Sequence, residues 1–180
     1  MLVKHPIGSA ATRVLTTALA AVWLSGCPGP HSSHGFAGHR LGPVTVTSGC
    51  RVRASLPDPR CTPGSVLGAS AVYVCRPGYA RGVRHVPALE RLAVRRAYGV
   101  ALRHRPQELD HLVALELGGA NDPPNLWPEA ALPRPGYFEK DALENLLHRR
   151  VCAGHMTLAD AQRAIARDWV AAWKRAGRPR

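Results

Sequence analysis

The sequence lacks several patterns on which common classes of protein depend. No Cys-x-x-Cys pair is present to begin a structural zinc site, so a zinc site is only a weak alternative. No Gly-x-Ser-x-Gly nucleophile elbow is present, so serine-nucleophile chemistry has little support. No internal repeat is visible, which argues against a repeat protein. The apolar run at residues 14–24 is too short to cross a bilayer as a stable helix.

Acidic residues are scarce compared with basic ones. The 180 residues include 24 Lys and Arg against 12 Asp and Glu, a formal charge of +12 at pH 7, and nearly all the basic residues are arginine. Because a guanidinium pairs with phosphate through two parallel hydrogen bonds, a polyanion is the natural partner. A soluble surface in a chain rich in Arg, Ala and Gly is the alternative. The charge alone leaves both interpretations open.

The N-terminus has the features of an export signal. Lys4 and Arg13 supply positive charge before the apolar run at residues 14–24. The run ends in Leu24-Ser25-Gly26-Cys27, which resembles a bacterial lipobox, in which the cysteine is lipidated and becomes the new N-terminus. We therefore predict a lipoprotein-type signal peptide over residues 1–26, with ordinary signal cleavage as the alternative. The predicted protein is exported and lipid-anchored in the cell envelope, on its periplasmic or surface face.

The remaining chain divides into a tether and one domain. Residues 27–42 are rich in Pro, Gly, Ser and His and cannot bury enough apolar surface to fold, so they predict a flexible tether. Residues 43–176 form a single predicted domain. An even number of cysteines behind an export signal predicts disulfides, and three pairings are possible. These cysteines are Cys50, Cys61, Cys75 and Cys152.

Hydrophobic patterning predicts an α+β fold. Short strands are expected at residues 44–47, 50–53 and 71–75. A helix is expected at residues 87–98, with Leu89, Leu92 and Ala93 facing inward. Further helices are expected over residues 137–152 and from a Thr157 cap to about Arg175.

A β-hairpin is predicted at the centre of the domain. Apolar residues alternate with others from Leu109 to Leu117, and Gly118-Gly119 can supply the positive φ angles of a tight reversal. Residues 125–128 close the second arm, whereas Asn121 in the turn is interpreted as a surface or bracing residue. Because neighbouring strand residues face opposite sides, Asp110 and His111 can form one site only at an irregular strand end or a bulge.

This stretch carries a family resemblance. An Asp-His pair, a Gly-Gly turn and an Asn-Leu pair followed by a helix resemble the HNH endonucleases, which have the ββα-metal fold. The string ELDHLVALELGGANDPPNLWPE is similar to a subgroup of small exported bacterial HNH-like proteins. The resemblance covers roughly residues 61–169 and is densest over 108–152. One departure is Ala114, where the family pattern leads us to expect proline.

The resemblance implies a role for each matching residue. His111 would be the general base, Asp110 a metal ligand, and Asn125 the amide that holds the orientation of the base. His148 on the following helix would be the second ligand, with Glu144 and Asn145 as substitutes. The implied cofactor is a divalent metal ion, Mg²⁺ first, with Mn²⁺ and Zn²⁺ as alternatives.

Basic residues on the same helix predict the contacts to substrate. Lys140, Arg149 and Arg150 could bind phosphates beside the metal. The predicted function is therefore a metal-dependent endonuclease that acts on nucleic acid, with DNA as the first expectation and no obligate protein partner. The alternative is a catalytically silent envelope lipoprotein that uses the fold for binding or structure.

Overall fold

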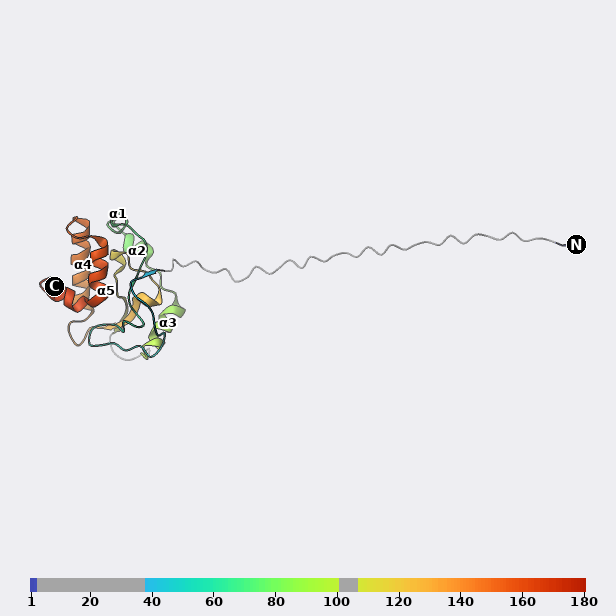
Figure 1. Cartoon of the computed structure of the whole chain (residues 1–180), viewed down its shortest axis with the longest axis horizontal. Helices are drawn as coiled ribbons and strands as arrows, with labels where there is room; N and C mark the ends of the chain where they lie inside the picture. Colours follow the sequence, from blue (N-terminus) through green and yellow to red (C-terminus); the bar gives the residue numbers. More distant parts are fainter. Residues whose placement is uncertain (3–37, 101–106) are drawn as a thin grey trace. The chain divides into compact units, whose positions relative to one another are not determined.

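The computed structural model describes residues 1–2, 38–100 and 107–180 (Figure 1). The predicted signal peptide, the lipidation candidate Cys27 and most of the predicted tether lie outside the described residues. All the helices and strands described below lie within His34–Arg180. Within the described ranges, no helix is both long enough and apolar enough to cross a membrane.

The folded part is a mixed α+β structure, as the hydrophobic patterning predicted. Two small antiparallel sheets are present among the described residues, one of β1 (His39–Arg40) with β2 (Ser65–Val66) and one of β3 (Gln107–His111) with β4 (Leu126–Ala130). The helices are α1 (Ala71–Val74), α2 (Tyr79–Val83), α3 (Ala88–Ala97), α4 (Tyr137–Cys152) and α5 (Leu158–Arg175).

Helices α4 and α5 agree with the sequence prediction, and they supply much of the core. They lie side by side, and their apolar faces meet (Figure 1). Each buried Leu or Ile side chain contributes about 1.5–3 kcal/mol relative to the exposed side chain. Thr157 caps α5 by accepting a hydrogen bond from the amide of Asp160 at 3.1 Å. The buried residues that α4 and α5 add to the core are Leu143, Leu147, Val151, Ala161, Ile165, Trp169 and Ala172.

The connection between β3 and β4 is not the tight hairpin that the alternation predicted. Strand β3 ends at His111, which pairs with Leu126, and residues 112–125 form an irregular loop with two 3₁₀ turns, Leu115–Leu117 and Pro123–Asn125. The predicted strand arm to Leu117 is therefore wrong. The apolar residues of this loop are buried on several sides. Their pattern therefore reflects a buried loop and not one face of an extended strand.

The buried amide of Asn125 holds this loop together. Its Oδ1 accepts a hydrogen bond from the amide of Val113 at 2.9 Å, and its Nδ2 donates to the carbonyls of Val113 and Ala120, both at 2.9 Å. Gly119 is required at the same place, because a Cβ atom there would collide with the carbonyl oxygen of Val113. The side chain of Asn125 thus replaces the ladder bonds that a regular strand would have made.

Three other sequence predictions need correction. Residues 71–75 were predicted as a strand, but Ala71–Val74 form helix α1, whose buried residue is Val74. Residues 44–47 and 50–53 form no strand, and only an isolated bridge joins Arg53 to Leu56. Helix α3 forms where predicted, but it faces inward through Val94, and Leu89 is 80 % exposed.

Both predicted disulfides form, and the structure selects one of the three pairings. Cys50 is bonded to Cys61, and Cys75 is bonded to Cys152. The second bond joins α1 to the C-terminal end of α4, across 77 positions of sequence. Two disulfides indicate that the protein folds in a non-reducing, exported environment.

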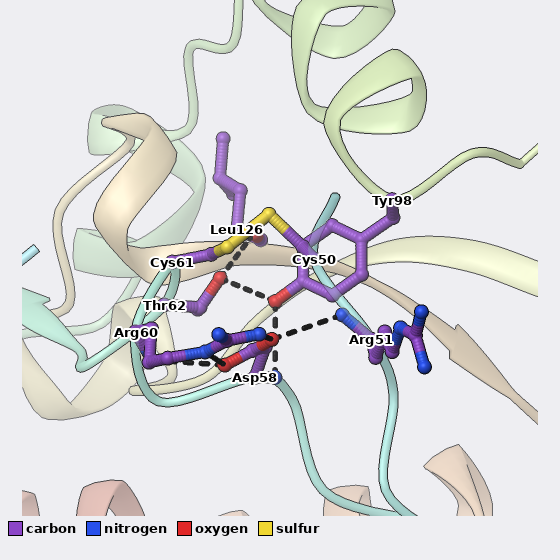
Figure 2. The surroundings of a disulfide bond; sticks show 8 residues. All are labelled: Cys50, Arg51, Asp58, Arg60, Cys61, Thr62, Tyr98 and Leu126. Atoms are coloured by element: carbon purple, nitrogen blue, oxygen red, sulfur yellow. Dashed lines mark hydrogen bonds and ion pairs between the residues drawn. A yellow bond between two sulfur atoms is a disulfide. The ribbon is translucent and has the colours of Figure 1, made fainter. Parts of the chain in front are cut away.

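A buried carboxylate organises the segment around the Cys50–Cys61 bond (Figure 2). Asp58 accepts hydrogen bonds from the backbone amides of Arg51 and Arg60, both at 3.1 Å, and pairs with the Arg60 guanidinium at 2.9 Å. Its own amide donates to the Tyr98 hydroxyl at 3.2 Å, which lies 2.7 Å from the Thr62 hydroxyl. These bonds tie the segment to the end of α3 and hold the pKa of Asp58 well below its usual range, with the Arg60 hydrogen bond as the main cause.

Replacing Asp58 by alanine is expected to lower the free energy of unfolding by about 1–3 kcal/mol at pH 7, because the partly buried backbone amides of Arg51 and Arg60 lose their acceptor. The Asp58 carboxylate stabilises the fold fully above its unfolded pKa of about 4. This contribution disappears as the pH falls through the lower pKa of the folded state. Urea denaturation should therefore show a difference between wild type and variant that shrinks from pH 4 toward pH 2.

The exposed Asp141 provides a control for this experiment. Asp141→Ala should change the free energy of unfolding much less at pH 7. The role given to Asp58 would be contradicted if the difference in free energy of unfolding between wild type and Asp58→Ala stayed the same below pH 4.

Candidate functional site

The end of β3 directs two adjacent side chains into different surroundings. Asp110 pairs with Trp127 and His111 with Leu126 across the two-stranded sheet, so the two side chains leave opposite faces. His111 is the last residue of β3, and the irregular loop follows directly. His111 thus lies at the strand end that the sequence predicted, but Asp110 and His111 are both regularly paired and do not point toward one place.

The His111 ring is held by a side chain from the loop. Its Nε2 lies 3.1 Å from Oδ1 of Asn121, whose Nδ2 donates to the carbonyl of Val83 at 2.7 Å. The Nδ2 bond fixes the orientation of the Asn121 amide, so the oxygen must face the imidazole. An oxygen can only accept, which means that Nε2 carries the proton and Nδ1 holds the lone pair in the neutral ring.

Burial also favours the neutral form of His111. The residue is only 4 % exposed, and this burial lowers the pKa of the imidazole below its usual value. The charge of Asp110 and the Asn121 hydrogen bond oppose the shift but do not cancel it. At neutral pH the ring is therefore a base with a free nitrogen.

Asp110 belongs to a buried cluster centred on Lys140. The Lys140 ammonium is 0 % exposed and lies 2.5 Å from Asp110 Oδ2 and 2.7 Å from the backbone carbonyl of His111. It also contacts Glu144 Oε1, one helical turn further along α4, and lies 3.9 Å from Glu129 Oε2 on β4. The predicted phosphate contact of Lys140 does not agree with this position, because the ammonium faces carboxylates in the interior.

The cluster separates the pKa values of its acids. Burial opposes ionisation of Asp110, but the charge of Lys140 and hydrogen bonds outweigh it and lower the Asp110 pKa. Burial raises the pKa of Glu129 and of Glu144 well above the usual range, because Lys140 only partly offsets the loss of hydration. The pKa of Lys140 is raised by Asp110, Glu144 and Glu129, against the effect of burial. The stable ion pair in the cluster is therefore Lys140 with Asp110.

His148 lies in different surroundings from those that the resemblance implied. Its Nε2 is 3.1 Å from the carbonyl of Val74 and 3.4 Å from the sulfur of Cys152. Candidate ligand atoms of Cys75, His148 and Cys152 lie within 4.8 Å of one another, the one such group in the described part of the chain. The Cys75–Cys152 disulfide removes both thiolates, so the group lacks the ligands of a soft-metal site.

The other predicted site residues divide between the interior and the surface. Glu144, the substitute ligand, joins Asp110 at Lys140, whereas Asn145 is exposed and donates to the Asp141 carbonyl at 2.9 Å. Asn125 is fully buried, and its side chain bonds to backbone groups of the loop and to the amide of Ser65 in β2. Arg149 and Arg150 are exposed in the last turn of α4.

Three residues near the site were missed or undervalued by sequence reasoning. Glu129 is an acid in β4, where the three residues before it are buried as well, and this unusual placement was a signal. Asn121 was interpreted as a surface or bracing residue, because only the fold shows that it reaches both His111 and Val83. Arg84 is exposed at the end of α2, and its charge acts on His111, which no sequence spacing could show.

No protein-family model, curated protein or solved structure matches this chain. Its function must therefore be inferred from its own residues and their geometry.

Proposed function

We propose that this protein is a metal-dependent phosphodiesterase that cleaves nucleic acid, with DNA as the first candidate substrate and His111 as the general base. One observation carries the proposal. His111, with a free ring nitrogen, adjoins Asp110, whose carboxylate belongs to a cation-binding cluster. Hydrolysis of a phosphodiester needs these two elements together, a base to take a proton from water and positive charge for the transition state.

The order of elements supports the same proposal. Antiparallel strands β3 and β4 precede α4, and the first turn of α4 brings Lys140 to the end of β3. Strand, strand and helix in this order would correspond to the ββα unit of the HNH endonucleases. The residues that the resemblance marked as base and first ligand, His111 and Asp110, both lie where the helix meets the strands.

The carboxylates fit a hard divalent ion. Asp110 and Glu144 offer oxygen ligands of the kind that Mg²⁺ and Mn²⁺ prefer, and both already contact a cation, the Lys140 ammonium. These two residues would hold the metal ion, and His148 stays a prediction without contact to them in the described structure. When bound, the ion would supply positive charge for the phosphate and the departing oxygen.

Within the protein, His111 would take the proton from the attacking water at Nδ1, because Nε2 already donates to Asn121. Asn121 would act as a positioning residue that fixes the ring and its tautomer. Arg84, Arg149 and Arg150 are exposed and would bind phosphates on either side of the cleaved bond.

One observation favours the alternative of a catalytically silent lipoprotein. Lys140 neutralises Asp110 within the protein, so the cluster can be satisfied as a purely structural ion pair. A plasmid-nicking assay separates the two functions. The proposed enzyme should nick supercoiled plasmid with Mg²⁺ or Mn²⁺ and stop in EDTA. A silent protein, or one that ignores EDTA, would contradict the proposal.

Asn121→Leu is expected to slow cleavage by about 10–100-fold, the usual effect of removing a residue that orients an active-site group. The physical reason is that the imidazole loses the acceptor that fixes its tautomer. Nitrogen-15 NMR should then show protonation of the His111 ring shared between Nε2 and Nδ1 instead of confined to Nε2. Asn121→Asp keeps an acceptor and should keep the Nε2–H tautomer; unchanged ring signals in the leucine variant would contradict the assigned role.

A further inference from the structure

The surroundings of Lys140 resemble those of a bound metal ion more than those of an ordinary ion pair. In the described structure its ammonium contacts oxygen atoms: carboxylates of Asp110 and Glu144, the carbonyl of His111, and the more distant carboxylate of Glu129. An all-oxygen set of carboxylates and a backbone carbonyl is the ligand set of hard divalent cations. The ammonium is fully buried and lies at the centre of this set.

Glu129 provides an independent observation. Its side chain is 1 % exposed, and no group among the described residues donates a hydrogen bond to either of its carboxyl oxygens, while its carboxyl group faces that of Asp110. The nearer oxygen faces the Lys140 ammonium from 3.9 Å, too far for a hydrogen bond. A buried polar group without a hydrogen-bond donor destabilises the fold, so such groups often serve a ligand or a reaction. Three carboxyl groups thus surround one cation, and the third, Glu129, receives no hydrogen bond from any described donor.

We propose that Lys140 is an internal competitor of the divalent metal ion and that Glu129 is a metal ligand. The ammonium holds the cation position in the metal-free protein. A hard divalent ion displaces it and draws together the carboxylates of Asp110, Glu144 and Glu129, which stand further apart around the ammonium. This inference rests on the proposed function, because it assumes that the site takes a metal ion at all. It adds a ligand that the family resemblance did not imply and gives Lys140 a regulatory role in place of a phosphate contact.

The Lys140 ammonium competes with a metal ion because it is covalently attached to α4, beside the carboxylates. Lys140 and Glu144 are one turn apart on the same helix, so the ammonium is always available at high effective concentration. A metal ion in solution must therefore overcome it, and the site fills only when the metal concentration is high. The set contains no sulfur and no imidazole, which favours Mg²⁺ or Mn²⁺ over softer ions.

Calorimetric titration with Mn²⁺, without nucleic acid, tests the competition. Lys140→Met removes the ammonium and keeps an apolar stem of similar length, so Mn²⁺ should bind roughly tenfold more tightly or better. Glu129→Gln in the Lys140→Met background should remove much of that gain. Lys174→Met, a change to an exposed lysine of α5, is the matched control and should bind Mn²⁺ as the wild type does.

A second measurement uses the wild-type chain and does not depend on the folding of any variant. Acetylation followed by mass spectrometry should show Lys140 protected without metal and reactive at saturating Mg²⁺, with Lys174 reactive in both. Unchanged protection of Lys140 at saturating metal would overturn the proposal, as would a folded Lys140→Met protein with unchanged Mn²⁺ affinity. A protein that passes both tests but cleaves no nucleic acid would refute the nuclease and leave the competition standing.

Discussion

Replacing His111 by alanine is expected to lower the rate of nucleic-acid cleavage by about 10²–10⁴-fold, the range for removing a general base. The neutral imidazole of His111 lies beside Asp110 and has a ring nitrogen that can accept a proton. No other base in the described site can take its place there. Mn²⁺ affinity should change little, because the ion is assigned to carboxylates. The measurements are single-turnover cleavage of a plasmid and calorimetric titration with Mn²⁺.

The exposed His155, which follows α4, offers a matched control for the His111 experiment. His155→Ala should cleave at the wild-type rate. Cleavage by His111→Ala at the wild-type rate would refute the mechanism, even if the protein proved to be a nuclease. Loss of Mn²⁺ binding in His111→Ala would show instead that the imidazole belongs to the metal site.

The disulfide between Cys75 and Cys152 is expected to contribute about 4–5 kcal/mol to the free energy of unfolding. It closes a loop of 77 positions, and the entropy that a crosslink removes from the unfolded chain grows with loop length. The Cys50–Cys61 bond closes only 11 positions and should contribute about 3 kcal/mol. Chemical denaturation of the two double Cys→Ser variants measures both values.

The comparison of the two double variants is itself the control. Each variant removes one disulfide and leaves the other one intact, so the difference between the two variants isolates the loop length and local packing. Equal losses, or a larger loss for the Cys50/Cys61 pair, would show that the network around Asp58 outweighs chain entropy.

The parts of the fold that depend on local periodicity could be predicted from the sequence. Helix α4 begins at Tyr137 and ends at Cys152 as expected, because a repeating apolar face determines a helix within a few turns. The loop after β3 could not be predicted, because its path depends on Asn125 reaching the backbone of Val113 and Ala120. The short α1 escaped prediction for a similar reason: Ala71–Val74 is rich in β-branched and aromatic residues, and packing overrides that preference.

The candidate site was predictable only as far as adjacent residues define it. Asp110 and His111 were selected from one dipeptide and its context, and their position at a strand end is confirmed. The partners of these two residues come from other elements, Asn121 from the loop and Lys140 from α4. Such partners depend on how the loop and α4 pack against β3, which sequence spacing alone does not determine.

The late position of α5 in the chain has a consequence for when the protein becomes able to act. Ile165 and Trp169 of α5 complete the core, and the Trp169 indole donates to the carbonyl of Ser55, 114 positions earlier, at 2.7 Å. At about 5–20 residues per second, a ribosome adds Trp169 about 3–12 s after His111. During that interval the nascent chain contains His111, the proposed base, but not the helix that completes the core.

The Cys75–Cys152 disulfide also forms late, because Cys152 lies near the end of the chain. A reducing cytosol would delay this bond further. The nuclease that we propose could not assemble its active site before α5 is made. The late position of α5 would then help to protect the nucleic acids of the cell that makes the protein.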